Sequence, residues 1–129
     1  MVAAPWIPDE TLEASVKAGV IDPVFIWSAL DCTSAFPMLP AGKGKALVLG
    51  QMSVRINCDV KVGERCVMLG WPISQEGKKH FSASAVIGES GSVAAVARAT
   101  WMQRTFSLNQ IIFDKAFCHF DNAMSGKYE

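Results

Sequence analysis

A single carboxylate within an apolar stretch is the residue best suited to chemistry. Residues 23–36 contain Asp31 and no other charged side chain. At helical spacing Asp31 shares a stripe with Trp27 and Ser34, and Ser28 lies beside it three residues earlier. Burying a carboxylate is costly, which favours a general base or a group that orients water. The alternative is a structural Asp that is hydrogen-bonded to a neighbouring turn or to a second subunit.

Two further groups of polar residues are candidates for ligand binding. Lys78, Lys79 and His80 follow a predicted hairpin loop, where cationic side chains can meet phosphate groups. Without a ligand the same residues are expected to be solvated strand ends. Gln51 and Ser53 alternate with apolar residues along a predicted strand, which places both polar side chains on one of its faces.

Several other chemistries are not expected. The chain has no GxSxG motif, and Cys32 has no identifiable histidine base, so nucleophilic catalysis by Ser or Cys is disfavoured. No CxxC pair or zinc-type spacing of His and Cys occurs, so we predict no metal and no cofactor. Four cysteines without such a pattern are expected to be reduced thiols in the core: Cys32, Cys58, Cys66 and Cys118.

Length and composition indicate one globular domain that tends to self-associate. The chain has 129 residues, of which 50% are hydrophobic and 19% charged, so disorder is excluded. Twelve basic and twelve acidic residues cancel, which argues against a nucleic-acid partner. No apolar run reaches the ~18 residues of a membrane span. Residues 1–8 carry two prolines and no basic residue, which does not fit a signal peptide, so a cytoplasmic protein is expected.

Two helices are predicted near the start of the chain. Asp9 can cap a short first helix that Gly19 would end, and Asp22 followed by Pro23 begins a second one. Pro37 prevents that second helix from continuing. Because the second helix is apolar on nearly every face, it must be enclosed on most sides, for example by a curved sheet.

Beyond the second helix the hydrophobic period becomes two, which predicts four antiparallel strands in a meander. The strand over 66–73 is nearly continuously apolar, as expected for a strand buried on both faces, and Pro72 suggests a bulge. Alanines along 92–102 indicate that the apolar helix approaches that strand closely. The remaining strands are expected over 51–58 and 78–87, with an additional one over 1–7.

The C-terminal residues have a separate character. Ser107 and Gln110 fit a helix capping box. Apolar residues then recur at roughly helical spacing, which predicts an amphipathic helical extension over 105–129: Leu108, Ile111, Ile112, Phe117 and Phe120.

Four short motifs in this order resemble the hotdog-fold thioesterase-like superfamily. The similarity covers roughly residues 3–103 and is strongest to the C-terminal unit of tandem-hotdog acyl-CoA thioesterase-like proteins. The motifs are Trp27-Ser28-Ala29-Leu30-Asp31-Cys32, Val62-Gly63-Glu64-Arg65, Gly77-Lys78-Lys79-His80 and Ala99-Thr100-Trp101.

The resemblance implies an α+β hotdog domain over 1–104, in which an antiparallel sheet curls around the long helix. Two such units join their sheets edge to edge, so a chain with one unit is expected to form a homodimer or a dimer of dimers. The implied ligand is an acyl-CoA or a similar small hydrophobic molecule on a pantetheine carrier. Family members bind it in a tunnel at the dimer interface.

The resemblance also implies a role for Asp31. In related thioesterases the helix Asp orients or activates the water that attacks the thioester carbonyl. Catalytic tandem relatives have a glutamine on the last strand that helps to position this water, whereas the present chain has Ala99 or a near neighbour there. Gln51 and Ser53 on the first long strand could substitute for this glutamine. Two main hypotheses follow: a thioester hydrolase, or a non-catalytic binder of acyl or small hydrophobic ligands. A scaffold whose groove is filled by its own side chains is the third.

Overall fold

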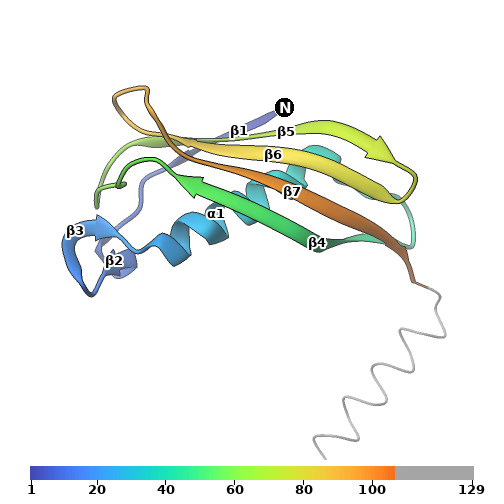
Figure 1. Ribbon diagram of the computed structural model, residues 1–129, viewed down its shortest axis with the longest axis horizontal. Helices are drawn as coiled ribbons and strands as arrows, with labels where there is room; N and C mark the ends of the chain where they lie inside the picture. Colours follow the sequence, from blue (N-terminus) through green and yellow to red (C-terminus); the bar gives the residue numbers. More distant parts are fainter. Residues whose placement is uncertain (107–129) are drawn as a thin grey trace, which may run out of the picture.

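A computed structural model describes residues 1–106 of the chain and shows one long helix against one face of an antiparallel sheet (Figure 1). The helix α1 spans Pro23–Ala35. The sheet has five strands in the order β1-β5-β6-β7-β4. Of the predicted helical extension over 105–129, residues 107–129 lie outside the described residues. The strands are β1 (Val2–Trp6), β4 (Lys45–Ile56), β5 (Cys66–Glu76), β6 (Lys79–Ile87) and β7 (Val93–Thr105).

The sheet differs from the predicted four-stranded meander in one connection. Strands β5, β6 and β7 follow one another, but β4 pairs with β7 and not with β5. Within residues 1–106, β4 therefore forms one edge of the sheet and keeps one side unpaired. Strand β1 forms the other edge by pairing with β5, which confirms the additional strand predicted over 1–7.

The predicted first helix is wrong. Asp9 does cap a turn, accepting a hydrogen bond from the Thr11 N–H at 2.8 Å, and the bonds from Thr11 lower the pKa of Asp9. The turn is only the short 3-10 helix η1 (Glu10–Leu12), and the hairpin of β2 (Glu13–Ala14) and β3 (Lys17–Ile21) follows it.

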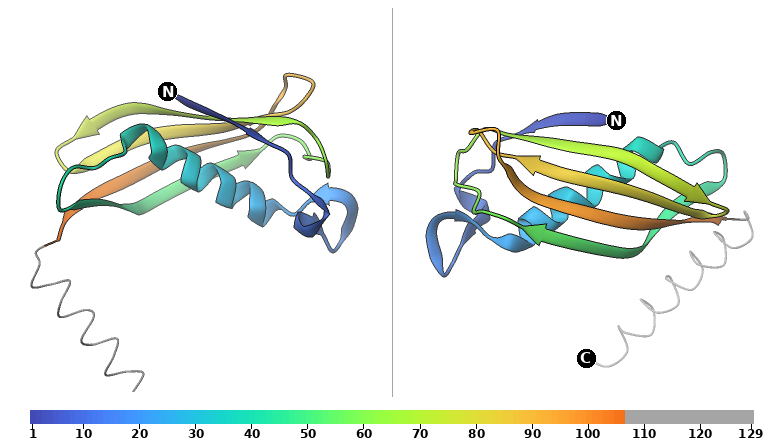
Figure 2. Two further views of the ribbon diagram at one scale, coloured as in Figure 1. Left: turned by 180° about the vertical axis from the view of Figure 1, so that it is seen from behind. Right: turned by 45° about the horizontal axis from the view of Figure 1, so that its top comes forward.

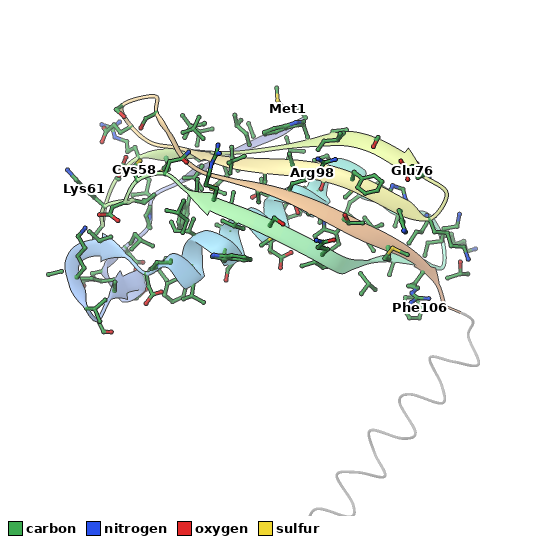
Figure 3. All side chains as sticks on the ribbon, in the orientation of Figure 1. Met1, Cys58, Lys61, Glu76, Arg98 and Phe106 are labelled. Atoms are coloured by element: carbon green, nitrogen blue, oxygen red, sulfur yellow. The ribbon has the colours of Figure 1, made fainter. Side chains whose placement is uncertain are left out.

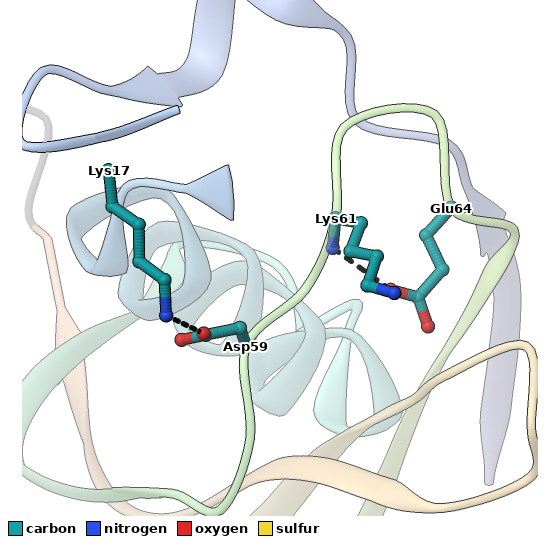
Figure 4. A network of polar contacts seen from close by, with 4 residues as sticks. All are labelled: Lys17, Asp59, Lys61 and Glu64. Carbon is teal, nitrogen blue, oxygen red and sulfur yellow. Dashed lines mark hydrogen bonds and ion pairs between the residues drawn. The ribbon is translucent and has the colours of Figure 1, made fainter. Parts of the chain in front are cut away.

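Contacts with a segment distant in sequence explain this hairpin. The Ile21 N–H donates to the Val60 carbonyl at 2.9 Å, and Lys17 forms an ion pair with Asp59 (Figure 4). The Lys61 N–H donates to Glu64 in the same loop at 2.9 Å. Pairing with this loop outweighs the weak local preference for a helix.

Helix α1 starts where it was predicted to start, but it is not enclosed on most sides as predicted. Asp22 caps it by accepting from the Val24 N–H at 3.0 Å, and Pro23 occupies the first turn. The helix ends in the short 3-10 helix η2 (Phe36–Met38), which contains Pro37. The sheet covers one side of α1 (Figure 2), whereas Val24 is 57% and Trp27 41% exposed. A single five-stranded sheet does not wrap far enough to cover the far side.

Small residues on β7 allow α1 to lie close to the sheet, as predicted. Ala95, Ala97 and Ala99 face the helix and are fully buried. On β6, the Ser84 hydroxyl donates to the main-chain carbonyl of Leu30 at 2.8 Å. The helix is thus held to the sheet by a hydrogen bond as well as by apolar contact.

Strand β5 is buried on one face only, in contrast to the prediction. Cys66, Met68 and Gly70 point inward and are buried, whereas Val67 and Ile73 are exposed on the outer face. The outer face of the sheet has no second layer in the described chain, which is why this strand alternates. The irregularity suggested by Pro72 is confirmed, since the register shifts between Pro72 and Ser74.

The cysteines are not all in the core. Cys66 is buried, and burial together with the nearby charges of Glu64 and Glu89 raises its pKa to about 11. Cys32 and Cys58 are exposed free thiols, so the prediction of core thiols is wrong for both. Cys118 lies outside the described residues.

None of the helices within residues 1–106 is long and apolar enough to cross a membrane.

Helix α1 lies very close to the backbone of β5 at Gly70. A Cβ added to Gly70 would lie 2.2 Å from the main-chain oxygen of Thr33, so Gly70→Ala must push the helix away. We expect the free energy of unfolding to fall by about 1–3 kcal/mol in urea titrations. Gly50→Ala is the control, because its Cβ would meet Met102 Cγ at 3.3 Å and need only a small shift. Equal urea midpoints for wild type and Gly70→Ala would contradict the packing described.

Candidate functional site

Helix α1 divides the inner face of the sheet into two flanks of different chemistry. On one flank, toward β1, Ser28 and Cys32 line a groove. On the other, toward β4, lies the predicted stripe of Trp27, Asp31 and Ser34. The direction of this stripe follows from Ser34, whose hydroxyl accepts a hydrogen bond from Trp101 Nε1 at 3.1 Å. Trp101 in turn pairs with Leu49 of β4.

Asp31 has an unusual environment for a carboxylate. Its Oδ1 atom is buried and has no hydrogen-bond partner within residues 1–106, although the residue as a whole is partly exposed. Its main-chain oxygen accepts from the Ser34 hydroxyl at 2.8 Å, but this bond does not involve the side chain. Buried polar atoms are nearly always hydrogen-bonded, and an ionised carboxylate only accepts. Oδ1 is therefore an acceptor that no donor within residues 1–106 satisfies.

The two serines predicted beside Asp31 are separated by the structure. Ser34 is completely buried, and its hydroxyl both donates to Asp31 O and accepts from Trp101. It holds the helix in place and is not accessible to a substrate. Ser28 lies in the groove on the β1 flank and donates to the Val24 carbonyl at 3.0 Å. The structure thus does not assemble Ser28 and Ser34 into one site with Asp31.

Gln51 and Ser53 lie on the outer face of the sheet, away from α1. Gln51 pairs with Thr100 and Ser53 with Arg98, and with Phe81 these residues line a small pocket of about 240 Å³. The helix-facing neighbour, Ala99, instead pairs with Met52. Gln51 and Ser53 therefore cannot contact a water held by Asp31 of the same chain.

A bulge explains why Gln51 faces outward. The register of β4 against β7 shifts between Leu49 and Gln51, so Gly50 is the extra residue. With regular pairing from Leu49 onward, Gln51 would oppose Ala99 and face the helix. Strict alternation does not reveal such a shift, although the glycine is a sequence signal for it.

The predicted basic cluster is split between solvent and the inner face. Lys78 and Lys79 are exposed at the β5–β6 hairpin. His80 pairs with Trp101, and its Nε2 atom is buried without a hydrogen-bond partner in the described part of the chain. Two strand positions further, Ser82 Oγ is also buried and has no partner among these residues. Sequence reasoning did not identify His80 and Ser82 as an inward-facing polar pair, although their period-two spacing was a signal.

The groove on the β1 flank was also not predicted. It has a volume of about 1050 Å³ and is almost entirely apolar. A groove between a helix and an edge strand has no signature in a one-dimensional pattern. It runs along α1 and is lined among others by Trp6, Phe25, Ala29, Cys32, Phe36, Leu39 and Met68.

Among residues 1–106, no three His, Cys, Asp or Glu side chains come together in a way that could hold a metal ion.

The different roles of the two serines can be tested by stability. Ser34→Ala removes two internal hydrogen bonds and leaves Trp101 Nε1 buried without an acceptor, so we expect a loss of about 1–3 kcal/mol in unfolding free energy. Ser28→Ala is the matched control on the same helix and should stay within about 0.5 kcal/mol of wild type. Chemical denaturation measures both. A Ser34→Ala protein as stable as Ser28→Ala would contradict the assigned role.

Comparison with known proteins supports the fold. No protein-family model matches the chain, and no curated protein matches it in sequence. A Thermus thermophilus hypothetical protein described as a thioesterase superfamily member superposes with a TM-score of 0.74 at 11% identity, over 97% of this chain and 93% of that one.

Two further solved structures are similar. A Streptococcus mutans protein bound to acetyl-CoA gives a TM-score of 0.67 at 14% identity, covering 81% of each chain. A thioesterase from Haemophilus influenzae gives 0.67 at 18% identity, covering 80% of this chain and 71% of that one. The predicted hotdog fold of thioesterase-like proteins is thereby confirmed for this chain.

Proposed function

We propose that the protein hydrolyses a thioester of the acyl-CoA type, with Asp31 as the general base or water-orienting carboxylate. The observation that carries the proposal is the Oδ1 atom of Asp31, which is buried and has no partner within residues 1–106, on a helix with no other charged side chain. Support comes from the fold, which is shared with thioesterase-superfamily structures and with a protein bound to acetyl-CoA.

The reaction follows from the chemistry of a carboxylate acceptor. A water hydrogen-bonded to the Asp31 carboxylate attacks the thioester carbonyl carbon, and its proton passes to the carboxylate. Main-chain N–H groups can stabilise the oxyanion that forms. The carbon–sulfur bond then breaks, the carboxylic acid is released, and the carrier thiolate takes up the proton. Water is the only co-reactant.

We propose that a second copy of the chain completes this site. Trp27 and Val24 are exposed on α1, and β4 has an unpaired edge within residues 1–106. A partner that extends the sheet at β4 would cover Trp27 and turn the Asp31 flank into a cleft between subunits. In this arrangement Trp27 contacts the acyl group, Lys78 and Lys79 supply positive charge for the phosphates of the carrier, and His80 supplies a hydrogen-bonding group.

A non-catalytic binder of acyl or small hydrophobic ligands is the second candidate. Two observations favour it. The groove on the β1 flank is large and apolar, and buried Ala99 offers no amide to position a water. A site with weakly positioned water would bind a thioester without rapid turnover.

Release of free thiol from a panel of acyl-CoAs tests the proposed reaction. Asp31→Asn keeps the shape but cannot take a proton, so we expect the rate to fall about 10²–10⁴-fold. Asp9→Asn is the control, because Asn also caps a turn and Asp9 lies outside the site. Equal rates for Asp31→Asn and wild type would refute the role of Asp31. If neither protein releases thiol but an acyl ligand raises the melting temperature, the protein is a binder.

The proposed dimer predicts a change in mass for one exposed residue. Wild type should sediment at twice the chain mass of 13.9 kDa. Trp27→Asp places a charge on the surface to be buried, so the protein should become monomeric while its circular dichroism stays unchanged. Val16→Asp is the control, since Val16 is 95% exposed at the β2–β3 hairpin. A monomeric wild type, or a dimeric Trp27→Asp protein, would contradict this assembly.

A further inference from the structure

The outer face of the sheet, which points away from α1, carries two adjoining hollows around Arg98 (Figure 3). We propose that this surface binds a phosphate group attached to a flat heteroaromatic ring, as in a nucleotide. The phosphate lies between Arg55 and Arg98, and the ring rests on Phe81. Neither Asp31 nor α1 takes part in this site, so the inference does not depend on the proposed hydrolysis.

Strand register brings two arginines together on this face. Arg98 of β7 pairs with Ser53 of β4, and two positions along Val96 pairs with Arg55. The arginines thus occupy diagonal positions on neighbouring strands, where Cα atoms are about 7–8 Å apart. Both side chains are exposed, and both line one hollow of about 300 Å³. Two guanidinium groups at this spacing can contact the same phosphate, and each of them can donate two hydrogen bonds to it.

No carboxylate on the sheet balances these two charges. Glu76 is the single acidic residue on the five described strands, and it pairs with Lys79 at the end of β5. Neither arginine forms an ion pair within residues 1–106. Solvated protein surfaces usually mix both signs of charge, and two neighbouring cations repel each other. A bound dianion such as phosphate removes this repulsion.

Neutral polar groups and an aromatic side chain line the second hollow, which has a volume of about 240 Å³. Ser53 and Arg98 border both hollows, so a ligand can extend from one to the other. Phe81 supplies an aromatic ring, on which a flat heteroaromatic ring can stack. The Gln51 amide and the Thr100 hydroxyl can both donate and accept hydrogen bonds, which suits the polar edge of such a ring.

The bulge at Gly50 explains how the polar side chains of β4 gather on this face. It turns Gln51 outward, and through strict alternation Ser53 and Arg55 face outward as well. With regular pairing from Leu49 onward, the same three side chains would face the helix. Bulges that re-aim side chains in this way are common next to active sites. The register of β4 thus builds the outer site at the expense of the inner one.

Binding of AMP to the full chain, measured by isothermal titration calorimetry, tests the site. We expect Arg98→Gln to weaken AMP binding about 10–100-fold, because a charged donor to the phosphate is lost. Arg65→Gln is the matched control, since Arg65 is an exposed arginine that lines neither hollow. Both variants change the net charge equally. Their urea midpoints should resemble that of wild type, because both side chains are exposed.

The aromatic part of the site is tested separately. Phe81→Leu keeps an apolar side chain but removes the ring, so AMP should bind about tenfold more weakly. Adenosine lacks the phosphate and should bind wild type at least about tenfold more weakly than AMP does. Coenzyme A is titrated as well, because its nucleotide end has the same chemistry. If Arg98→Gln also weakens its binding, coenzyme A is a source of the ligand; if only AMP is affected, the ligand is a free nucleotide. Both results support the site.

Three results would overturn the proposal. The first is that AMP does not bind wild type at millimolar concentration. The second is that Arg98→Gln binds AMP as tightly as Arg65→Gln does, because the phosphate would then lie elsewhere. The third is that inorganic phosphate binds as tightly as AMP, because the aromatic ring would then contribute nothing.

Discussion

The close seating of α1 on small residues of the sheet governs the rest of the architecture. Ala97 and Ala99 of β7 and Gly70 of β5 let the helix approach so closely that the Ser84 hydroxyl reaches a main-chain carbonyl of the helix. A helix is about 10 Å wide, whereas five strands span about 19 Å. A helix held down along the middle of such a sheet necessarily leaves an uncovered flank on each side.

The two flanks differ because the helix carries different residues on its two sides. Toward β4 it presents Asp31 and Trp27, and toward β1 it presents mainly apolar residues. Chemistry is therefore possible on the first flank and apolar packing on the second, whereas both edge strands, β4 and β1, keep one unpaired side within residues 1–106. Because α1 borders both flanks, its hydrophobic residues are not confined to a single stripe.

Local features were predictable from the sequence, and features set by distant pairing were not. The start of α1 at Asp22 and the irregularity at Pro72 depend on residue types at single positions, and both were predicted correctly. The helix predicted within residues 10–21 was wrong because the hairpin in its place is held by a loop about 40 residues away in sequence. The predicted pairing of β4 was wrong for the same reason. No local pattern distinguishes pairing with β7 from pairing with β5.

The candidate site shows the same division, with a consequence for the mechanism. Asp31 could be chosen as the candidate residue because one carboxylate on an apolar helix is unusual in the local sequence. Whether strand residues such as Gln51 face Asp31 depends on the register of the strands. The Gly50 bulge turns Gln51 to the outer face, and Ala99 has no polar atom in its side chain. Gln51 is thus turned away from Asp31, and the Gln103 amide of β7 donates to the Ala41 carbonyl. Under the proposed hydrolysis, the second group that fixes the water would be a main-chain amide or a residue of the proposed partner subunit, which would link hydrolysis to dimer formation.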